Sequence, residues 1–373
     1  MTTKTKAQPN RYDIVGSFLR TPELKNATAK FRSGELNQGE FKVIRQEQTQ
    51  QLVEKEVAHG LKDVTDGEFN RSWWHLDFLW GLNGVDKYDY KESYKFEGAH
   101  TRTDNAELTG KVSFNPDHPF FETFEYLQSI TPDGVTPKQT IPSPTMLFRD
   151  NRSDNWPNFY DTREAYLDDL AKAYHLTILH FYELGARYVQ IDDTTWAFLI
   201  SKLNETKDDQ TEHAKYVKLA EEGIQVINAA IADLPEDLTV TTHICRGNFK
   251  STFLFSGGYE AVAQYLGQLN YDEFFLEYDN NRAGDLSPIK TIWNNRPNTI
   301  IVLGLITSKD GQLEDCKQVI HRVNEATEFV PLENLAISTQ CGFASTEEGN
   351  AITEADQWAK IDLVKSIADE IWK

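Results

Sequence analysis

The stretch YVQIDD (188–193) is a short run of β-branched and apolar residues that ends in two carboxylates. Apolar residues recur at three- and four-residue spacing before it, over 162–184, and after it, over 212–231, which predicts a helix on each side. Four similar runs follow along the chain: TVTTHIC (239–245), EFFLEYD (273–279), TIIVLGL (299–305) and LAISTQC (335–341). Further helices are expected over 258–268, 312–327 and 355–372. Nearly continuous apolar strands that alternate with helices indicate a parallel sheet buried on both faces.

The first half of the chain supplies three more candidate strands: YDIVGS (12–17), KDVTDGE (62–68) and KQTIPSP (138–144). Eight strands are the number that closes a (β/α)₈ barrel, so we expect an α/β fold with one TIM barrel spanning 1–373. The segment 69–137 after the second strand is rich in Trp, Tyr, Phe and charge. It is expected to be an insertion within the barrel, with some helix and a hairpin over 94–114.

Composition restricts the class of protein. The net charge of -20 disfavours nucleic acid and anionic membranes as partners. No apolar run approaches the roughly 18 residues of a membrane span, and the polar start MTTKTKAQPN, expected to be frayed, does not resemble a signal peptide. Three cysteines cannot form a disulfide framework in a chain of 373 residues. These features predict a reduced cytoplasmic protein, and they leave a homo-oligomer open.

Unusual polar residues stand at the carboxyl ends of six of the eight predicted strands. They are Ser17, Asp66 and Glu68, Asp192 and Asp193, His243 and Cys245, Glu277, and Cys341. The carboxyl ends of barrel strands converge on one mouth, where the active sites of TIM barrels lie. The sequence therefore predicts a functional site at this mouth.

A metal site is one interpretation of these residues. His243 and Cys245 are two residues apart on a strand, so both side chains point to the same face. With the second thiolate of Cys341 and the carboxylate of Glu277 they would make a four-coordinate zinc site. The alternative is that Cys245 and Cys341 are small buried hydrophobic residues. Cys316, inside an amphipathic helical pattern, is expected to have no role.

Six motifs carry a resemblance to a known family: VGSFLRT (15–21), DGEFNR (66–71), QIDD (190–193), THICRGN (242–248), FFLEYD (274–279) and STQCGF (338–343). In this order they resemble the C-terminal catalytic barrel of the cobalamin-independent methionine synthases over essentially the whole chain. The chain is too short to include the duplicated N-terminal barrel of the full-length enzymes. The resemblance implies transfer of a methyl group to the thiol of homocysteine, giving methionine, with Zn²⁺ as cofactor.

The resemblance also implies site residues. It places zinc on His243, Cys245, Glu277 and Cys341, which is the set expected from the strand ends. It places the amino-acid part of homocysteine against Val15, Gly16, Ser17, Glu68 and Asp192. The two carboxylates could pair with an ammonium group, although residues of this kind at strand-to-helix loops can also be helix caps. Asp193 departs from the family, which usually has glutamate followed by proline there.

Two departures concern the methyl donor. The family has a histidine after the seventh strand that acts as an acid toward the departing pterin, whereas here Ile306 and Thr307 occupy that stretch, so the catalytic acid is unknown. His75, His100 or His118 of the insertion could replace it. The pterin-stacking tryptophan expected after the third strand is also absent. The aromatic candidates for its place are Phe148, Trp73, Trp74 and Trp80.

Two alternative functions remain open. The stretch GLITSK (304–309) resembles the epoxyalkane:coenzyme M transferases, which also use zinc to activate a thiol, so the protein could be a zinc thiol alkyltransferase with another thiol or alkyl donor. A non-catalytic zinc or amino-thiol binding protein would keep the ligands without turnover. Zinc hydrolysis is disfavoured, because two thiolates make the metal a poor activator of water.

Overall fold

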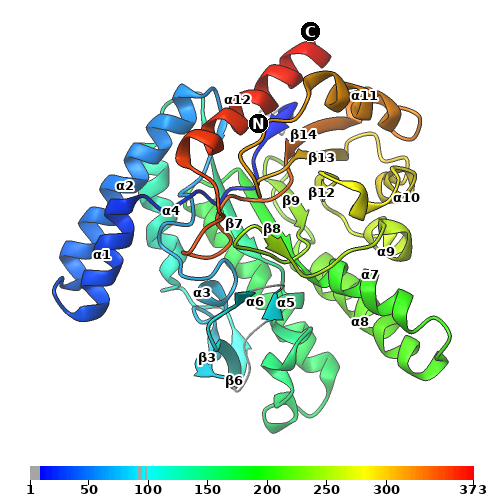
Figure 1. The fold of residues 1–373 in the computed structure, drawn as a ribbon. Coiled ribbons are helices and arrows are strands. Elements are labelled where there is room, and N and C mark those ends of the chain that lie inside the picture. Colours follow the sequence, from blue (N-terminus) through cyan, green and yellow to red (C-terminus); the bar gives the residue numbers. More distant parts are fainter. Residues whose placement is uncertain (1–8, 91–94, 97–98) are drawn as a thin grey trace, which may run out of the picture.

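The computed structural model describes residues 9–90, 95–96 and 99–373. Eight parallel strands stand at its centre with helices around them (Figure 1). They are β1 (Tyr12–Asp13), β2 (Asp63–Val64), β7 (Thr136–Pro142), β8 (Tyr188–Asp193), β9 (Thr239–Ile244), β12 (Glu273–Glu277), β13 (Ile300–Ile306) and β14 (Leu335–Thr339). Their order is β1-β14-β13-β12-β9-β8-β7-β2, which confirms the (β/α)₈ TIM barrel.

The first two barrel strands are shorter than predicted. Each leaves the extended conformation early, at Gly16 with φ 132° in one case and at Gly67 with φ 63° in the other. The segments beyond them still join the two ends of the sheet. The amide of Phe18 donates to the carbonyl of Gly67 at 3.1 Å, and the Thr65 hydroxyl donates to the carbonyl of Gly16 at 2.6 Å.

The helices cover the outside of the barrel. The four-turn and longer ones are α2 (Gln38–Ala58), α6 (Arg163–Glu183), α8 (Gln210–Ala230) and α12 (Glu354–Ile371). The shorter ones are α1 (Pro22–Ser33), α3 (Leu76–Leu79), α4 (Pro119–Ile130), α5 (Thr145–Phe148), α7 (Thr195–Glu205), α9 (Ala263–Leu266), α10 (Pro288–Trp293) and α11 (Cys316–Ala326). The helix expected over 258–268 is only a 3-10 turn followed by α9. No helix in the described ranges is long and apolar enough to cross a membrane.

The segment after β2 adds two small two-stranded antiparallel sheets. β3 (Asn83–Asp89) pairs with β6 (Asp104–Ser113), and β4 (Lys95–Phe96) pairs with β5 (Ala99–His100). The prediction of one hairpin over 94–114 was therefore wrong for the strand in its second half. That strand, β6, pairs with the earlier β3. The turn of that hairpin, with residues 94 and 97–98, and the frayed start over 1–8 lie outside the described residues.

Helix α4 belongs to the outer helix layer. The Tyr126 hydroxyl on α4 donates to the carbonyl of Gln46 on α2 at 2.9 Å. We therefore propose that the insertion ends near Pro119, before α4, instead of extending to 137.

The insertion is fastened to the mouth of the barrel. Trp73 forms a β-bridge with Thr346, and the amide of Trp74 donates to the carbonyl of Ser345 at 3.2 Å. An ion pair of 2.8 Å joins Arg102 to Glu347. These contacts hold the tryptophans of the insertion beside the segment that follows β14.

Candidate metal centre

Four of the predicted site residues meet at the carboxyl ends of the barrel strands. They are His243 on β9, Cys245 just after it, Glu277 at the end of β12, and Cys341 two residues beyond β14. One potential ligand atom from each lies within 4.8 Å of all the others, and all four residues are buried. Strands far apart in sequence thus supply two thiols, an imidazole and a carboxylate to one point.

The separations fit a zinc ion. Two Zn–S bonds of about 2.3 Å at a tetrahedral angle place their sulfur atoms about 3.8 Å apart. The Sγ atoms of Cys245 and Cys341 are 3.8 Å apart. For a Zn–N and a Zn–O bond the corresponding separation is about 3.4 Å, and Nε2 of His243 lies 3.6 Å from Oε1 of Glu277. The donor set therefore matches the metal in kind and in spacing.

Asp192 orients the imidazole. It lies directly opposite His243 in the β8–β9 register, so both side chains project to the same face. Its Oδ1 is 3.2 Å from Nδ1 of His243, while Nε2 lies 3.1 Å from the carbonyl oxygen of Gln340 and 3.6 Å from Oε1 of Glu277. Burial lowers the pKa of His243, but hydrogen bonds to Asp192 and Glu277 outweigh it and raise the pKa to about 10. The surroundings thus favour a positive charge at this point, which a metal ion would supply.

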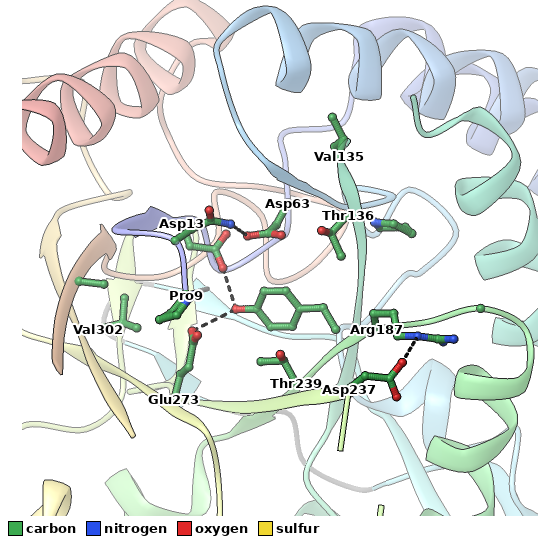
Figure 2. Close-up of a pocket in the computed structure, with 15 residues that line it drawn as sticks. Pro9, Asp13, Asp63, Val135, Thr136, Arg187, Asp237, Thr239, Glu273 and Val302 are labelled. Carbon is green, nitrogen blue, oxygen red and sulfur yellow. Dashed lines mark hydrogen bonds and ion pairs between the residues drawn. The ribbon is translucent and has the colours of Figure 1, made fainter. Parts of the chain in front are cut away.

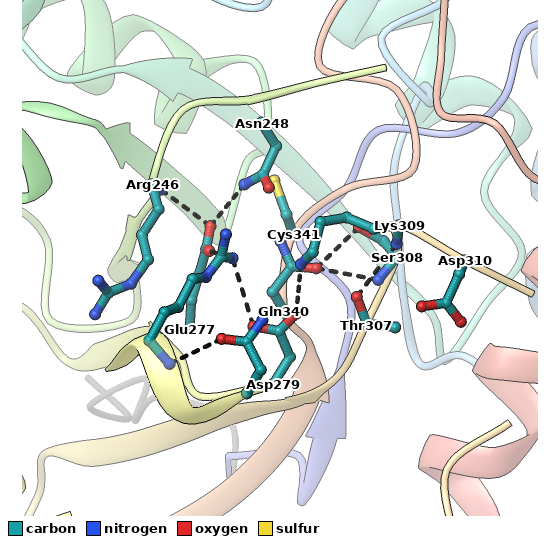
Figure 3. Close-up of polar contacts among 12 residues, drawn as sticks. Arg246, Asn248, Glu277, Asp279, Thr307, Ser308, Lys309, Asp310, Gln340 and Cys341 are labelled. Carbon is teal, nitrogen blue, oxygen red and sulfur yellow. Dashed lines mark hydrogen bonds and ion pairs between the residues drawn. The ribbon is translucent and has the colours of Figure 1, made fainter. Parts of the chain in front are cut away.

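Glu277 is held by three donors. Oε1 accepts from the amide of Arg246 at 3.1 Å and from Nδ2 of Asn248 at 2.9 Å, and Oε2 accepts from Nη2 of Arg282 at 2.9 Å (Figure 3). Burial raises the pKa of Glu277, but the hydrogen bond to His243 and the charge of Arg282 outweigh it and lower the pKa to about 2. The carboxylate is therefore anionic and fixed in place.

The two thiols differ in acidity. A hydrogen bond from the thiol of Cys341 lowers the pKa of Cys245, although burial opposes this shift. The same hydrogen bond, together with burial, raises the pKa of Cys341. Cys245 is thus the first of the pair to become a thiolate. Cys316 is exposed at the start of α11 and far in sequence from this cluster.

The residues predicted to bind substrate lie around the same point. One cavity is lined by Val15, Ser17, Glu68 and Asp192 together with His243, Cys245 and Cys341, and also by Trp74, Gly342 and Ser345. Gly16 is not among the lining residues. Its carbonyl accepts from Thr65, and an added Cβ would lie 3.0 Å from Cγ2 of Thr140, so Gly16 permits close packing of the first strand end.

Glu68 provides an unsatisfied carboxylate. Its Oε1 is 3.3 Å from Nη1 of Arg71, whereas its buried Oε2 has no hydrogen-bond partner. Burial raises the pKa of Glu68 to about 7, although Arg71 and Arg20 oppose this shift. The backbone of Glu68 has φ 61°, a conformation unusual for a glutamate. A charged donor at Oε2 would satisfy the group and stabilise its ionised form.

Asp193, next to Asp192, has a different place. Its carboxylate accepts from the hydroxyl of Thr145 at 2.9 Å and from the amide of Thr195 at 2.7 Å, on the outer side of β8. Asp193 therefore stabilises the start of α7 and does not line the cavity.

No imidazole stands where the acid histidine was expected. The side chain of Ile306 packs in the hydrophobic core between barrel and helices, and the amide of Thr307 donates to Glu314 at 2.8 Å. Neither residue lines the cavity of the metal cluster.

The three candidate replacements differ in position. His118 caps α4, where it accepts from the amide of Phe120 at 3.2 Å, and its Nε2 is 2.9 Å from the carbonyl of Phe78. His75 lines a neighbouring aromatic pocket that shares Trp74 with the metal cavity. Burial lowers its pKa well below the usual value, and Arg152 adds to the shift. The side chain of His100 lies outside the part of the chain that is described.

Sequence reasoning missed several residues of the site. Trp74 was expected only as one of several stacking candidates, and Gly342 and Ser345, one and four residues after Cys341, were not expected as site residues. Gln190 was missed as the donor to Asp192 at 2.8 Å. Arg282, on a loop beyond β12, has no pattern in the sequence that could have indicated its contact with Glu277.

The model of the cobalamin-independent synthase catalytic domain matches residues 13–360. This chain belongs to the cobalamin-independent methionine synthase family. A relative of similar length is the uncharacterised Bacillus subtilis protein YxjH, which is 45% identical over 100% of this chain and 97% of its own length. A putative vitamin-B12-independent methionine synthase from Listeria monocytogenes has a TM-score of 0.78 and 39% identity, covering 99% of this chain and 100% of that one.

More distant members of the family show the fold and the difference in length. A B12-independent methionine synthase from Shewanella, 19% identical, has a TM-score of 0.69 over 99% of this chain and 98% of that one, and so supports the barrel. A 5-methyltetrahydropteroyltriglutamate–homocysteine methyltransferase from Thermotoga maritima is 22% identical over 88% of this chain but only 40% of its own length. Membership of this family supports a methyltransferase-like enzyme.

Proposed function

We propose that this protein transfers a methyl group to the thiol of homocysteine, giving methionine, with one zinc ion held by His243, Cys245, Glu277 and Cys341. The observation that carries the proposal is one cavity lined by three members of the ligand cluster, His243, Cys245 and Cys341, together with the carboxylates of Glu68 and Asp192. An amino acid with a thiol requires a metal ligand site for its sulfur and an anionic partner for its ammonium group, and this cavity would offer both.

The ligand set supports zinc and a thiol substrate. Bound zinc lowers the pKa of a coordinated thiol, so that the thiolate forms near neutral pH. Asp192 keeps Nδ1 of His243 occupied and Nε2 directed at the site. Arg282, Asn248 and the amide of Arg246 hold Glu277 from outside.

The amino-acid part of homocysteine fits the other side of the cavity. The unpartnered Oε2 of Glu68 and the carboxylate of Asp192 are the acceptors for the ammonium group. Ser17 contributes a hydroxyl near the start of the segment after Cys341, where its Oγ accepts from the amide of Ala344 at 3.3 Å. We propose that this hydroxyl and Val15 bound the carboxylate end of the substrate.

The missing acid bears on the methyl donor. The sulfur forms a bond to the methyl carbon while the carbon's bond to its carrier breaks, and the electron pair leaves with the carrier. The nitrogen of a tetrahydrofolate is a poor leaving group unless it is protonated, and a positioned acid contributes about 10²–10⁴ in rate. Ile306 and Thr307 cannot provide that proton, and His75 is held neutral. We propose a donor whose leaving group needs no proton, such as a methylcobamide or a sulfonium, with the pocket of Trp73, Trp74 and Phe255 as its entry.

The test is a methyl-transfer assay with homocysteine and a panel of donors. We expect turnover with methylcobalamin or S-methylmethionine to exceed turnover with methyltetrahydrofolate by at least about tenfold, given the worth of the absent acid. Fast transfer from methyltetrahydrofolate that survives replacement of His75, His100 and His118 would refute the argument from the missing acid. Turnover with another thiol but none with homocysteine would favour a zinc thiol alkyltransferase instead.

A further inference from the structure

A second cavity lies at the opposite end of the barrel from the metal cluster. It has a volume of about 500 Å³ and is bounded by residues at the amino ends of the strands (Figure 2). Its apolar walls come from Pro9, Val135, Pro137, Val302 and Ala336, and its acidic groups include Asp13, Asp63 and Glu273. A volume of about 300–1,000 Å³ with apolar walls and a few polar groups is typical of small-molecule sites.

The charges at the floor of this cavity are unbalanced. The buried ammonium of Lys138 pairs with Asp13 at 2.8 Å and also donates to the carbonyl of Ile14 at 2.6 Å. Asp63 accepts from the amide group of Asn10 at 2.5 Å, which brings no charge. Arg187, the cation among the lining residues, pairs with Asp237 at 3.0 Å, so Asp13, Asp63 and Glu273 share the one ammonium group of Lys138.

Glu273 has only one weak donor. Its side chain belongs to a residue only 8% exposed, and the nearest hydroxyl is that of Tyr188, 3.4 Å from Oε2. A tyrosine hydroxyl has one hydrogen, and Asp13 at 2.8 Å is the closer acceptor (Figure 2). Burial, and then the charges of Asp13 and Asp63, raise the pKa of Glu273 to about 8. A buried carboxyl that faces a cavity and shares its one donor with a closer acceptor is the feature that a cationic ligand would satisfy.

A single metal ion does not fit this arrangement. Among the described residues, the only group of three or more metal-ligating side chains with ligand atoms close together is the cluster at the mouth. The carboxylates of Asp13, Asp63 and Glu273 are therefore too widely spaced to share one ion. An extended cation with an alkyl body suits both the spaced carboxylates and the apolar walls.

We propose that this cavity is a second binding site, which takes an aliphatic amine with its ammonium group on Glu273. The site is separate from the methyl-transfer site. The inner apolar cluster of Val15, Phe275, Ile300, Val302 and Ala336 lies between them, since Val302 and Ala336 line this cavity whereas Val15 lines the other. Binding here does not depend on the proposed function.

The probe is 1,4-diaminobutane, titrated into the whole protein at pH 8.5 by isothermal calorimetry. We expect saturable binding that is weakened at least tenfold in Glu273→Gln, and no binding of the neutral 1,4-butanediol. Glu333→Gln is the matched control, because Glu333 is an exposed carboxylate at the same end of the barrel that does not line the cavity. Asp63→Asn is a second variant in case Glu273→Gln does not fold, with folding checked by thermal melting.

Two outcomes would overturn the proposal. One is absence of diamine binding to the wild type up to about 10 mM, which is weaker than specific sites of this size achieve. The other is unchanged affinity in Glu273→Gln and Asp63→Asn while Asp192→Asn loses the binding, because the amine would then occupy the cavity at the mouth.

Discussion

Asp192 connects the metal cluster to the proposed substrate residues. Its Oδ1 accepts from Gln190 at 2.8 Å and contacts Nδ1 of His243 at 3.2 Å, while the residue also lines the cavity with Glu68. One carboxylate therefore orients a metal ligand and offers negative charge to an ammonium group. Because Asp192 and His243 are both buried, removal of the Asp192 charge would leave its buried partner without compensation.

Replacing Asp192 with Asn should weaken homocysteine binding by about 2 kcal/mol, because a hydrogen bond to a charged partner would be lost. Calorimetric titration of the zinc-loaded protein measures this change. The zinc content of the variant is determined in parallel, so that loss of metal is distinguished from loss of the ammonium contact. Equal affinity in variant and wild type would show that Asp192 has only a structural role.

At the level of single residues, the sequence predicted the four clustered ligands better than the residues that hold those ligands in place. The same-face spacing of His243 and Cys245, with strand ends that converge, was enough to bring in Glu277 and Cys341. Gly16 was assigned to the substrate, but it does not line the cavity. It has a positive φ, and a Cβ added to it would lie against Thr140. Arg282 could not be predicted because only the folded loop brings it to Glu277.

Strand β12 shows how position along one element decides the acidity of a carboxyl. Glu273 begins the strand and Glu277 ends it, and a separation of four residues places both on the inner face. The pKa of Glu277 is lowered to about 2 by its donors, whereas burial and the charges of Asp13 and Asp63 raise the pKa of Glu273 to about 8. The same residue type thus has its pKa shifted in opposite directions at the two ends of the barrel.

Glu273→Gln should raise the melting temperature at pH 9 and change it little at pH 5. A carboxyl with a raised pKa in the folded protein binds its proton more tightly there than in the unfolded chain, so its contribution to stability falls as pH rises from the usual pKa of 4.5 to about 8. Glutamine cannot ionise and removes this loss. The expected gain at pH 9 is at least about 2 °C by scanning calorimetry at a fixed rate. A variant less stable than wild type at pH 9 would show that the ionised carboxyl is satisfied.

The elements themselves were predicted unevenly. The buried strands β8, β9, β12, β13 and β14 lie within two residues of their expected bounds, because continuous apolar runs are a strong signal. Helices α1 and α2 were not predicted, although Asn37 and Glu40 form a capping box that marks the start of α2. The partner of β6 was misassigned because a local pattern cannot show which strand pairs with it.

At the scale of the whole molecule, the barrel and the insertion together enclose the site. The strand ends supply the metal ligands, and the insertion adds Trp74, fastened through Ser345 to the segment after Cys341. The pattern of eight strands in the sequence predicted the barrel. The barrel in turn implied that the polar residues at the strand ends meet at one mouth. The position of Trp74 depends on contacts between distant segments, so only the structure could provide it.

The central claim is that the four clustered residues bind zinc, and zinc content of the purified protein tests it most directly. We expect about one zinc per chain in the wild type, as for a four-coordinate site. Cys341→Ser should lose most of its zinc on gel filtration, whereas Cys316→Ser, which changes an exposed cysteine outside the cluster, should retain all of it. A wild-type protein without tightly bound zinc, or a Cys341→Ser variant with full zinc content, would contradict the account.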